Sequence, residues 1–149
     1  MILCDIDHFK RVNDEFGHAG GDQVLGDFAG LLQSLSRESV DSVIRYGGEE
    51  FLLVLPQTGL AGAEALAERM RSAFAGRASV LEDGRQVRTT ASFGIASVAA
   101  RDTAFIGSFE TLVGAADAQL YAVKRSGRNG VRGVEVTGGA ELKAPSPRA

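Results

Sequence analysis

Four acidic side chains occupy two places in the sequence where they could bind a divalent cation. Asp5 and Asp7 end the apolar run that opens the chain, and Glu49 and Glu50 follow a glycine pair. Mg²⁺ suits such oxygen ligands, and it usually combines one or two carboxylates with water and substrate phosphates. If Asp5 and Glu49 converge, two ions roughly 3.5–4 Å apart could drive in-line phosphoryl displacement. A polar strand end and a solvated hairpin are the alternative explanations.

The glycine pair Gly47-Gly48 lies between two runs of strand-forming residues, 43–44 and 51–55. A double glycine in this position predicts a β-hairpin, because tight two-residue turns need positive φ. Since glycine has no side chain, a bulky ligand could approach the backbone of the turn closely. The acidic residues beside it could then hold a cation against a phosphate.

Further polar residues could bind a nucleotide. Lys124 and Arg128 are four apart at the end of a predicted helix, so on one helix face they could clamp a triphosphate. Cations at a helix C-terminus are also favourable whatever the function. Asn13 and Asp22 flank a predicted loop, 17–21, and could together read the donor and acceptor edge of a purine. Asp22 could equally cap the helix that follows.

The elements that must position these residues follow from hydrophobic periodicity and turn signals. The sequence predicts strands or hairpins at 1–6, 43–55, 78–98 (across Asp83-Gly84) and 129–131, and helices at 9–16 (stopped by Gly17), 22–35, 60–74 and 109–125. Helices mixed with hairpins, without strict β-α-β alternation, predict an α+β fold in which helices cover a largely antiparallel sheet.

Composition bounds the class of protein. A chain of 149 residues that is 44% hydrophobic can form one domain with a real core. We expect that domain at 1–136 and a disordered tail at 137–149, where residues are small and polar. The net charge of −3 favours neither a nucleic-acid nor a membrane partner. With no membrane-spanning stretch and one cysteine, Cys4, we expect a cytoplasmic protein.

Together the motifs resemble the GGDEF family, the diguanylate cyclases. Residues 47–51, Gly-Gly-Glu-Glu-Phe, resemble the signature hairpin of that family. The family's strand-and-turn motif is matched by Asp5-Ile6-Asp7-His8-Phe9-Lys10, Asn13-Asp14, Phe16-Gly17-His18 and Gly21-Asp22. Residues 91–96 resemble its penultimate core strand, and 117–124 with 127–129 resemble its C-terminal motif. Several motifs in the right order make this resemblance specific, and it covers nearly the whole chain.

The resemblance implies a palm-like nucleotidyl cyclase sandwich that condenses two GTP into cyclic di-GMP and two pyrophosphates across a homodimer. It implies two Mg²⁺ ions per half-site, with Mn²⁺ as a possible substitute. Asp5, the backbone carbonyl of Ile6, Glu49 and Glu50 would hold them, with Glu49 and Glu50 as the catalytic residues. The implied substrate-binding residues are Lys10, Asn13, Asp22, Gly47, Gly48, Lys124 and Arg128.

The chain departs from the family pattern at its start, because its first residues already form the first strand. We therefore expect that the family's N-terminal segment and a sensor domain are missing. A catalytically silent GTP-binding or dimerisation module is the alternative function. A third possibility is a domain that makes a different cyclic dinucleotide.

A second departure concerns product inhibition, which in the family uses an Arg-x-x-Asp motif. Asp41 occupies the aspartate position, but Glu38 replaces the arginine and Arg37 is one residue out of register. We predict weak or no feedback binding of cyclic di-GMP there. Arg69, on the predicted helix 60–74, occupies the family's secondary inhibitory position and could contribute from a partner subunit.

Overall fold

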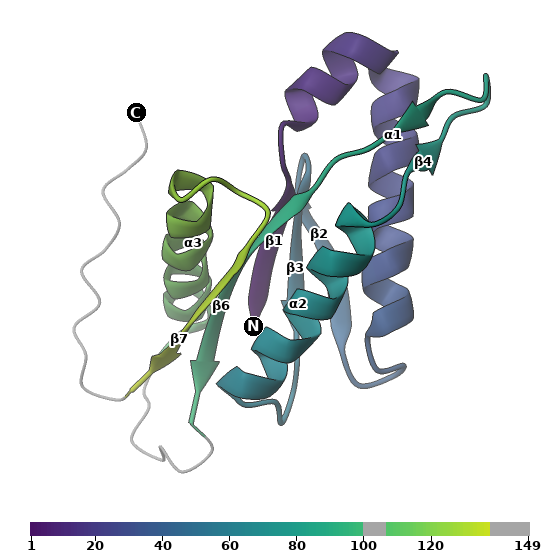
Figure 1. Cartoon of the computed structure of the whole chain (residues 1–149). Helices are drawn as coiled ribbons and strands as arrows, with labels where there is room; N and C mark the ends of the chain where they lie inside the picture. The colour runs from purple at the N-terminus through teal and green to yellow at the C-terminus, as the bar shows by residue number, and fades with distance from the viewer. Residues whose placement is uncertain (100–106, 138–149) are drawn as a thin grey trace.

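Five strands form a central sheet in the computed structural model, which describes residues 1–99 and 107–137 (Figure 1). They are β1 (Ile2–Ile6), β2 (Ser42–Gly47), β3 (Glu50–Val54), β6 (Ala91–Val98) and β7 (Val131–Val136). Their order is β2-β3-β1-β6-β7. All neighbouring pairs are antiparallel except β6 and β7, which run parallel. The α+β class is confirmed, with a mixed sheet.

Helices cover both faces of the sheet, so the core has two parts. α1 (Phe9–Leu35) and α2 (Leu60–Ala75) pack on one face, and α3 (Phe109–Arg125) packs on the other (Figure 1). Successive residues of β1 alternate between these layers, with Ile2 and Cys4 facing α1 and α2 and Leu3 facing α3. At Gly94 a side chain would overlap the α3 backbone, so α3 packs directly on β6.

The predicted helices at 60–74 and 109–125 are confirmed as α2 and α3, whereas the predicted helices at 9–16 and 22–35 are joined in α1. Gly17 interrupts α1 as expected, with φ 74° and ψ 172°, but residues 18–21 are helical and form no loop. Gly20 and Gly21 are buried against Phe16 and Asn13, where a larger residue would not fit. Close tertiary packing therefore outweighs the low helix propensity of glycine. Asp22 lies inside α1 and does not cap a helix.

The second half of the hairpin predicted across 78–98 is divided into two strands. β4 (Ser79–Val80) and β5 (Gln86–Val87) form a separate hairpin around Gly84, whose φ is 83°. The rest becomes β6 and pairs with β1 from Ala91 onward, and residues 88–90 between β5 and β6 belong to neither sheet. The final strand begins at Val131 rather than 129 and is longer than predicted.

The expected disordered tail at 137–149 lies outside the described residues except for its first residue. Among the helices in the described ranges, none has the length and apolar character needed to cross a membrane.

Candidate active site

The end of β1 and the β2–β3 hairpin bring the predicted metal-binding residues next to each other. Asp5 and Glu50 are register partners on β1 and β3. The amide of Ile6 donates to the carbonyl of Glu49 at 3.4 Å. The backbone of Asp5-Ile6 is thus adjacent to that of Glu49-Glu50, which meets the condition that the sequence left open.

The hairpin itself is confirmed, but its turn is shifted by one residue. Gly47 pairs with Glu50, so Gly48 and Glu49 form the two-residue turn, and a bulge lies between Arg45 and Gly47. Gly48 has φ 21°. Nε of Arg45 donates to the Gly48 carbonyl at 2.9 Å and closes the turn. Glu49 therefore occupies the turn, while Glu50 begins β3.

The Asp5 carboxylate is almost fully buried and only half satisfied. Nζ of Lys124 donates to Oδ2 of Asp5, and the two side chains are 27% and 7% exposed. Oδ1 is buried without a hydrogen-bond partner. Burial raises the pKa of Asp5 to about 6, Lys124 opposes the rise, and the charges of Asp7 and Glu50 add to it. A second cation, in addition to Lys124, would favour the ionised form of the Asp5 carboxylate.

These residues fit a divalent cation, although they do not form a complete cage. No three His, Cys, Asp or Glu side chains within residues 1–99 and 107–137 are grouped closely enough to hold a metal. The fit comes from the unpartnered Oδ1 of Asp5, the neighbouring strand position of Glu50 and the adjacent backbone of Ile6. Mg²⁺ commonly binds through so few carboxylates, with substrate phosphates completing the shell.

The three predicted phosphate-binding cations lie in different environments. Lys10 is exposed on α1 and pairs with Asp14 at 3.1 Å, and Lys124 contacts Asp5. A shared helix face for Lys124 and Arg128 required α3 to continue as far as Arg128, and it does not. α3 ends at Arg125, the amide of Ser126 donates to the Val123 carbonyl, and Arg128 follows in a turn with φ 65°.

The two predicted guanine-binding residues lie close together on α1. A side chain on Gly21 would overlap Oδ1 of Asn13, so the Asn13 amide lies beside the residue that precedes Asp22. Asp22 lines a cavity of about 520 Å³ between α1 and the β2–β3 hairpin, with Arg45 and Phe51. Glu50 lines a different cavity of about 450 Å³ beside α3. The structure therefore places Asp22 and Glu50 in separate cavities.

The predicted regulatory residues are separate from this site. Asp41 is bound by Arg37 through Nε and Nη2, with distances of 2.7–3.2 Å. The Arg37 guanidinium also donates to the Pro56 carbonyl at 2.8 Å, so the pair joins two loops. Hydrogen bonds from Arg37 hold the pKa of Asp41 below its usual value. Arg69 is exposed on α2.

Sequence reasoning missed a hydrogen-bonded group around Asp7. Its carboxylate accepts from Ser92, Thr90 and the amide of Asn129. Oδ1 of Asn129 in turn accepts from Arg71 at 2.8 Å. The only sequence signal was the acidic residue at a strand end, since the partners are 58 to 122 residues apart.

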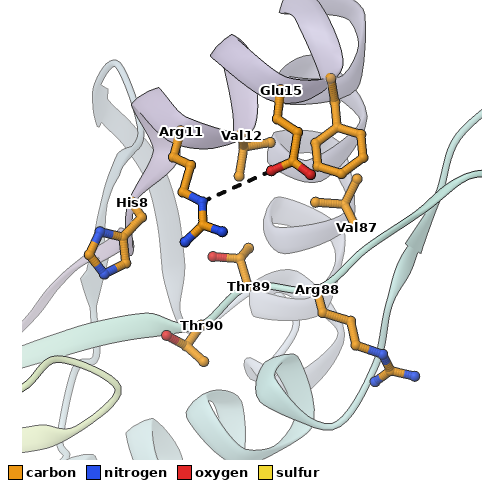
Figure 2. Close-up of a pocket in the computed structure, with 9 residues that line it drawn as sticks. His8, Arg11, Val12, Glu15, Val87, Arg88, Thr89 and Thr90 are labelled. Carbon is orange, nitrogen blue, oxygen red and sulfur yellow. Dashed lines mark ion pairs between the residues drawn. The ribbon is translucent and has the colours of Figure 1, made fainter.

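A third cavity, of about 370 Å³, is lined by residues of α1 and of the 87–90 segment, among them His8, Arg11, Thr89 and Thr90. Figure 2 shows the Arg11 side chain extending from α1 toward Thr89, while Arg88 points away from the cavity. Arg11 and Glu15 form a long ion pair of 4.0 Å. This cavity contains none of the predicted site residues.

Comparisons with known proteins found relatives that match most of this chain. Diguanylate cyclase A of Treponema denticola is 39% identical over 131 residues, which are 88% of this chain and 34% of that protein. The chain therefore spans about a third of this curated relative.

Two solved structures are similar over 89% of this chain. One is the GGDEF domain of DgcB from Caulobacter crescentus in complex with c-di-GMP, with a TM-score of 0.80 and 33% sequence identity. The match covers 75% of that chain. The active GGEEF domain of a diguanylate cyclase from Vibrio cholerae has a TM-score of 0.75 and 35% identity over 80% of its chain. A family model described as "Diguanylate cyclase, GGDEF domain" matches residues 1–130. The chain belongs to the GGDEF-domain family of diguanylate cyclases.

Proposed function

We propose that this domain condenses two GTP into cyclic di-GMP and two pyrophosphates, across a homodimer. The observation that carries the proposal is the buried, half-satisfied carboxylate of Asp5 beside Glu50 and Lys124. GGDEF diguanylate cyclases in general bind GTP, need a divalent metal and act as dimers. The hairpin sequence Gly-Gly-Glu-Glu-Phe at 47–51 is also the GGEEF variant for which the active domain from Vibrio cholerae is named.

In each half-reaction the 3′-hydroxyl oxygen of one GTP forms a bond to the α-phosphorus of the other. The bond from that phosphorus to the bridging oxygen breaks, and pyrophosphate leaves with its electron pair. Glu49, at the exposed turn, accepts the proton of the hydroxyl. A two-fold dimer aligns both reacting pairs, which one domain binding one GTP cannot do.

The metal ligands in this proposal are Asp5, the carbonyl of Ile6, Glu49 and Glu50. Bound Mg²⁺, as two ions per half-site or with Mn²⁺ in its place, would neutralise charge on the attacking and leaving oxygens. Lys124 leaves Oδ2 of Asp5 as this carboxylate takes up its ligand role. Its ammonium group then becomes available to the triphosphate.

The remaining residues bind and orient GTP. Lys10, Lys124 and Arg128 neutralise the phosphates. Asn13 and Asp22 hydrogen-bond guanine, which requires a nucleotide that extends from the hairpin toward α1. Gly47 and Gly48 let the phosphates approach the hairpin backbone closely.

The domain proposed for this activity is 1–136, acting in the cytoplasm as part of a longer protein with a sensor domain. The free, buried Cys4 is compatible with a reducing compartment. Relatives of much greater length support an additional domain. A sensor would regulate activity by bringing two cyclase domains together.

A silent GTP-binding or dimerisation module is the second candidate. The specific observation in its favour is that Lys124 bonds to Oδ2 of Asp5 and so competes with a metal ion for that oxygen. This module would bind GTP and form dimers without releasing pyrophosphate.

Incubation with GTP and Mg²⁺ over a range of protein concentrations separates the two candidates. An active cyclase forms cyclic di-GMP at a rate steeper than linear in protein, measured by chromatography. Glu49→Gln should lower turnover by at least about 100-fold, the scale of lost acid–base catalysis, while it retains much of the GTP binding. Activity within about tenfold of wild type in this variant would contradict the assigned role of Glu49.

A further inference from the structure

The turn after α3 has an unusual backbone. Gly127, Arg128 and Asn129 all have positive φ, at 112°, 65° and 45°. Glycine and asparagine adopt this left-handed region readily, but a long side chain such as that of Arg128 rarely does. A residue held there depends on contacts that fix its backbone, and such residues gather at functional sites.

Contacts on both sides of Arg128 fix this turn. The amide of Arg128 donates to the Val123 carbonyl at 3.0 Å, which ties the turn to the end of α3. The amide of Asn129 donates to Oδ2 of Asp7 at 3.0 Å. Nη1 of Arg71, on α2, donates to Oδ1 of Asn129 at 2.8 Å. The turn is therefore joined to α3, to the end of β1 and to α2.

Asp7 is a rigid anchor because its own position is determined by the sheet. It is 2% exposed, and Ser92 and Thr90 donate to its two carboxylate oxygens at 2.7 and 2.6 Å. Its amide donates to the Thr90 carbonyl at 2.8 Å. Both of its oxygens are thus engaged within the protein, unlike the half-satisfied carboxylate of Asp5.

We propose that Asp7 is a positioning residue for triphosphate binding, which acts by holding the backbone of Arg128, with Arg71 as a second anchor through Asn129. This inference rests on the proposed function, in which Arg128 binds phosphate. Asp7 is two residues beyond Asp5, so the same short segment carries the metal ligand and anchors the phosphate-binding turn. Asp7 therefore sets the separation between the Asp5 carboxylate and the backbone of Arg128.

A double-mutant cycle tests this role. GTP affinity in the presence of Mg²⁺ is measured by calorimetry for wild type, Asp7→Asn, Arg128→Ala and the double variant. Asparagine retains the shape of Asp7 but replaces one acceptor oxygen with a donor. Asp7→Asn should weaken GTP binding about tenfold in the wild-type background and less than about twofold in Arg128→Ala, because residues acting through one contact couple strongly.

Two further measurements separate positioning from a general loss of structure. Guanosine lacks the triphosphate, so its affinity should change less than about twofold in Asp7→Asn. Thr89→Val is the matched control. Thr89 donates to the backbone carbonyl of Asp7, whereas the Asp7 carboxylate accepts from Ser92, Thr90 and Asn129. It should leave the GTP affinity within about twofold of wild type.

Arg71→Met gives an independent test that leaves the carboxylate of Asp7 intact, should Asp7→Asn fail to fold. It should weaken GTP binding about threefold, and this effect should disappear in Arg128→Ala. Equal losses in both Arg128 backgrounds, or an equal loss of guanosine affinity, would overturn the positioning role alone. Failure of the wild-type protein to bind GTP would instead overturn the proposed function, and this inference with it.

Discussion

Lys124 on α3 donates a hydrogen bond to Oδ2 of Asp5 on β1, while Oδ1 of the same carboxylate is buried without a partner. The two residues are 119 positions apart in the chain. In the ligand-free protein the ammonium group therefore occupies one oxygen of a carboxylate that is proposed to bind a metal ion. The balance between the cost of burying the Asp5 charge and the stabilisation by the Lys124 ion pair can be measured.

Asp5→Asn should stabilise the ligand-free protein above pH 6. Burial raises the pKa of Asp5 from 3.8 to about 6, so its contribution to stability is complete below pH 3.8 and is lost as the pH rises to about 6. The gain at pH 7.5 should be on the order of 1–2 kcal/mol, since solvent and Lys124 moderate the cost of the charge.

Urea unfolding of both proteins from pH 4 to pH 8 checks this expectation. The two stabilities should be similar near pH 4 and should diverge as the pH rises. A less stable Asp5→Asn protein at pH 7.5 would mean that the Lys124 ion pair outweighs the cost of burial.

Lys124→Met should destabilise the ligand-free protein at pH 7.5 by about 1–3 kcal/mol, because it leaves a buried carboxylate without its cation. The loss should largely disappear in an Asp5→Asn background, where no charge remains to be compensated. Arg125→Met, in the same helical turn and exposed, is the matched control. Similar losses for both methionine variants would indicate a general effect at the helix end.

Gly21→Ala should weaken nucleotide binding more than it changes stability. The added methyl group would overlap Oδ1 of Asn13, so the amide proposed to bind guanine must move. Guanosine affinity should fall about fivefold or more, the scale of one lost hydrogen bond. Gly30→Ala meets open space in the same helix, away from the cavity that Asp22 lines. It should leave the affinity unchanged while it stabilises the helix by up to about 1 kcal/mol. Equal affinities in the two variants would remove Asn13 from the guanine site.

Asp41→Asn should lower stability at pH 7, and by a smaller amount at pH 3. Hydrogen bonds from Arg37 depress the pKa of Asp41, so its contribution is present above its unfolded pKa of about 3.9 and is lost as the pH falls through the lower folded pKa. Thermal unfolding at both pH values measures the difference. A loss of the same size at pH 3 would show that packing, rather than charge, holds the two loops.

The same ion pair predicts weak binding of cyclic di-GMP at Asp41. Its carboxylate is already engaged by Arg37, its side chain is 1% exposed, and Glu38 occupies the position where the family has an arginine. Calorimetry with cyclic di-GMP should detect no micromolar site that depends on Asp41. Micromolar binding that is lost in Asp41→Ala would refute this prediction.

Local sequence patterns were sufficient for the elements whose structure depends on near neighbours. Apolar residues at helical spacing predicted α2 and α3, and the glycine pair predicted the β2–β3 hairpin, with its turn displaced by one residue. The strand end at Asp5 and the hairpin at Glu50 were each predicted locally, whereas their placement side by side depends on the pairing of β1 with β3. The locally predicted features depend on side-chain periodicity and turn conformation, which a short segment already contains.

Tertiary packing decided the features that join distant segments. Residues 18–21 are helical despite the low helix propensity of glycine, and buried Gly20 lets α1 approach Leu81, which follows β4. The pairing of β6 with β1 separates it from the β4–β5 hairpin. The hydrogen bonds from the Asn129 amide to Asp7 and from Lys124 to Asp5 join residues more than a hundred positions apart. No local pattern specifies such contacts, because each one forms only after the sheet has brought its partners together.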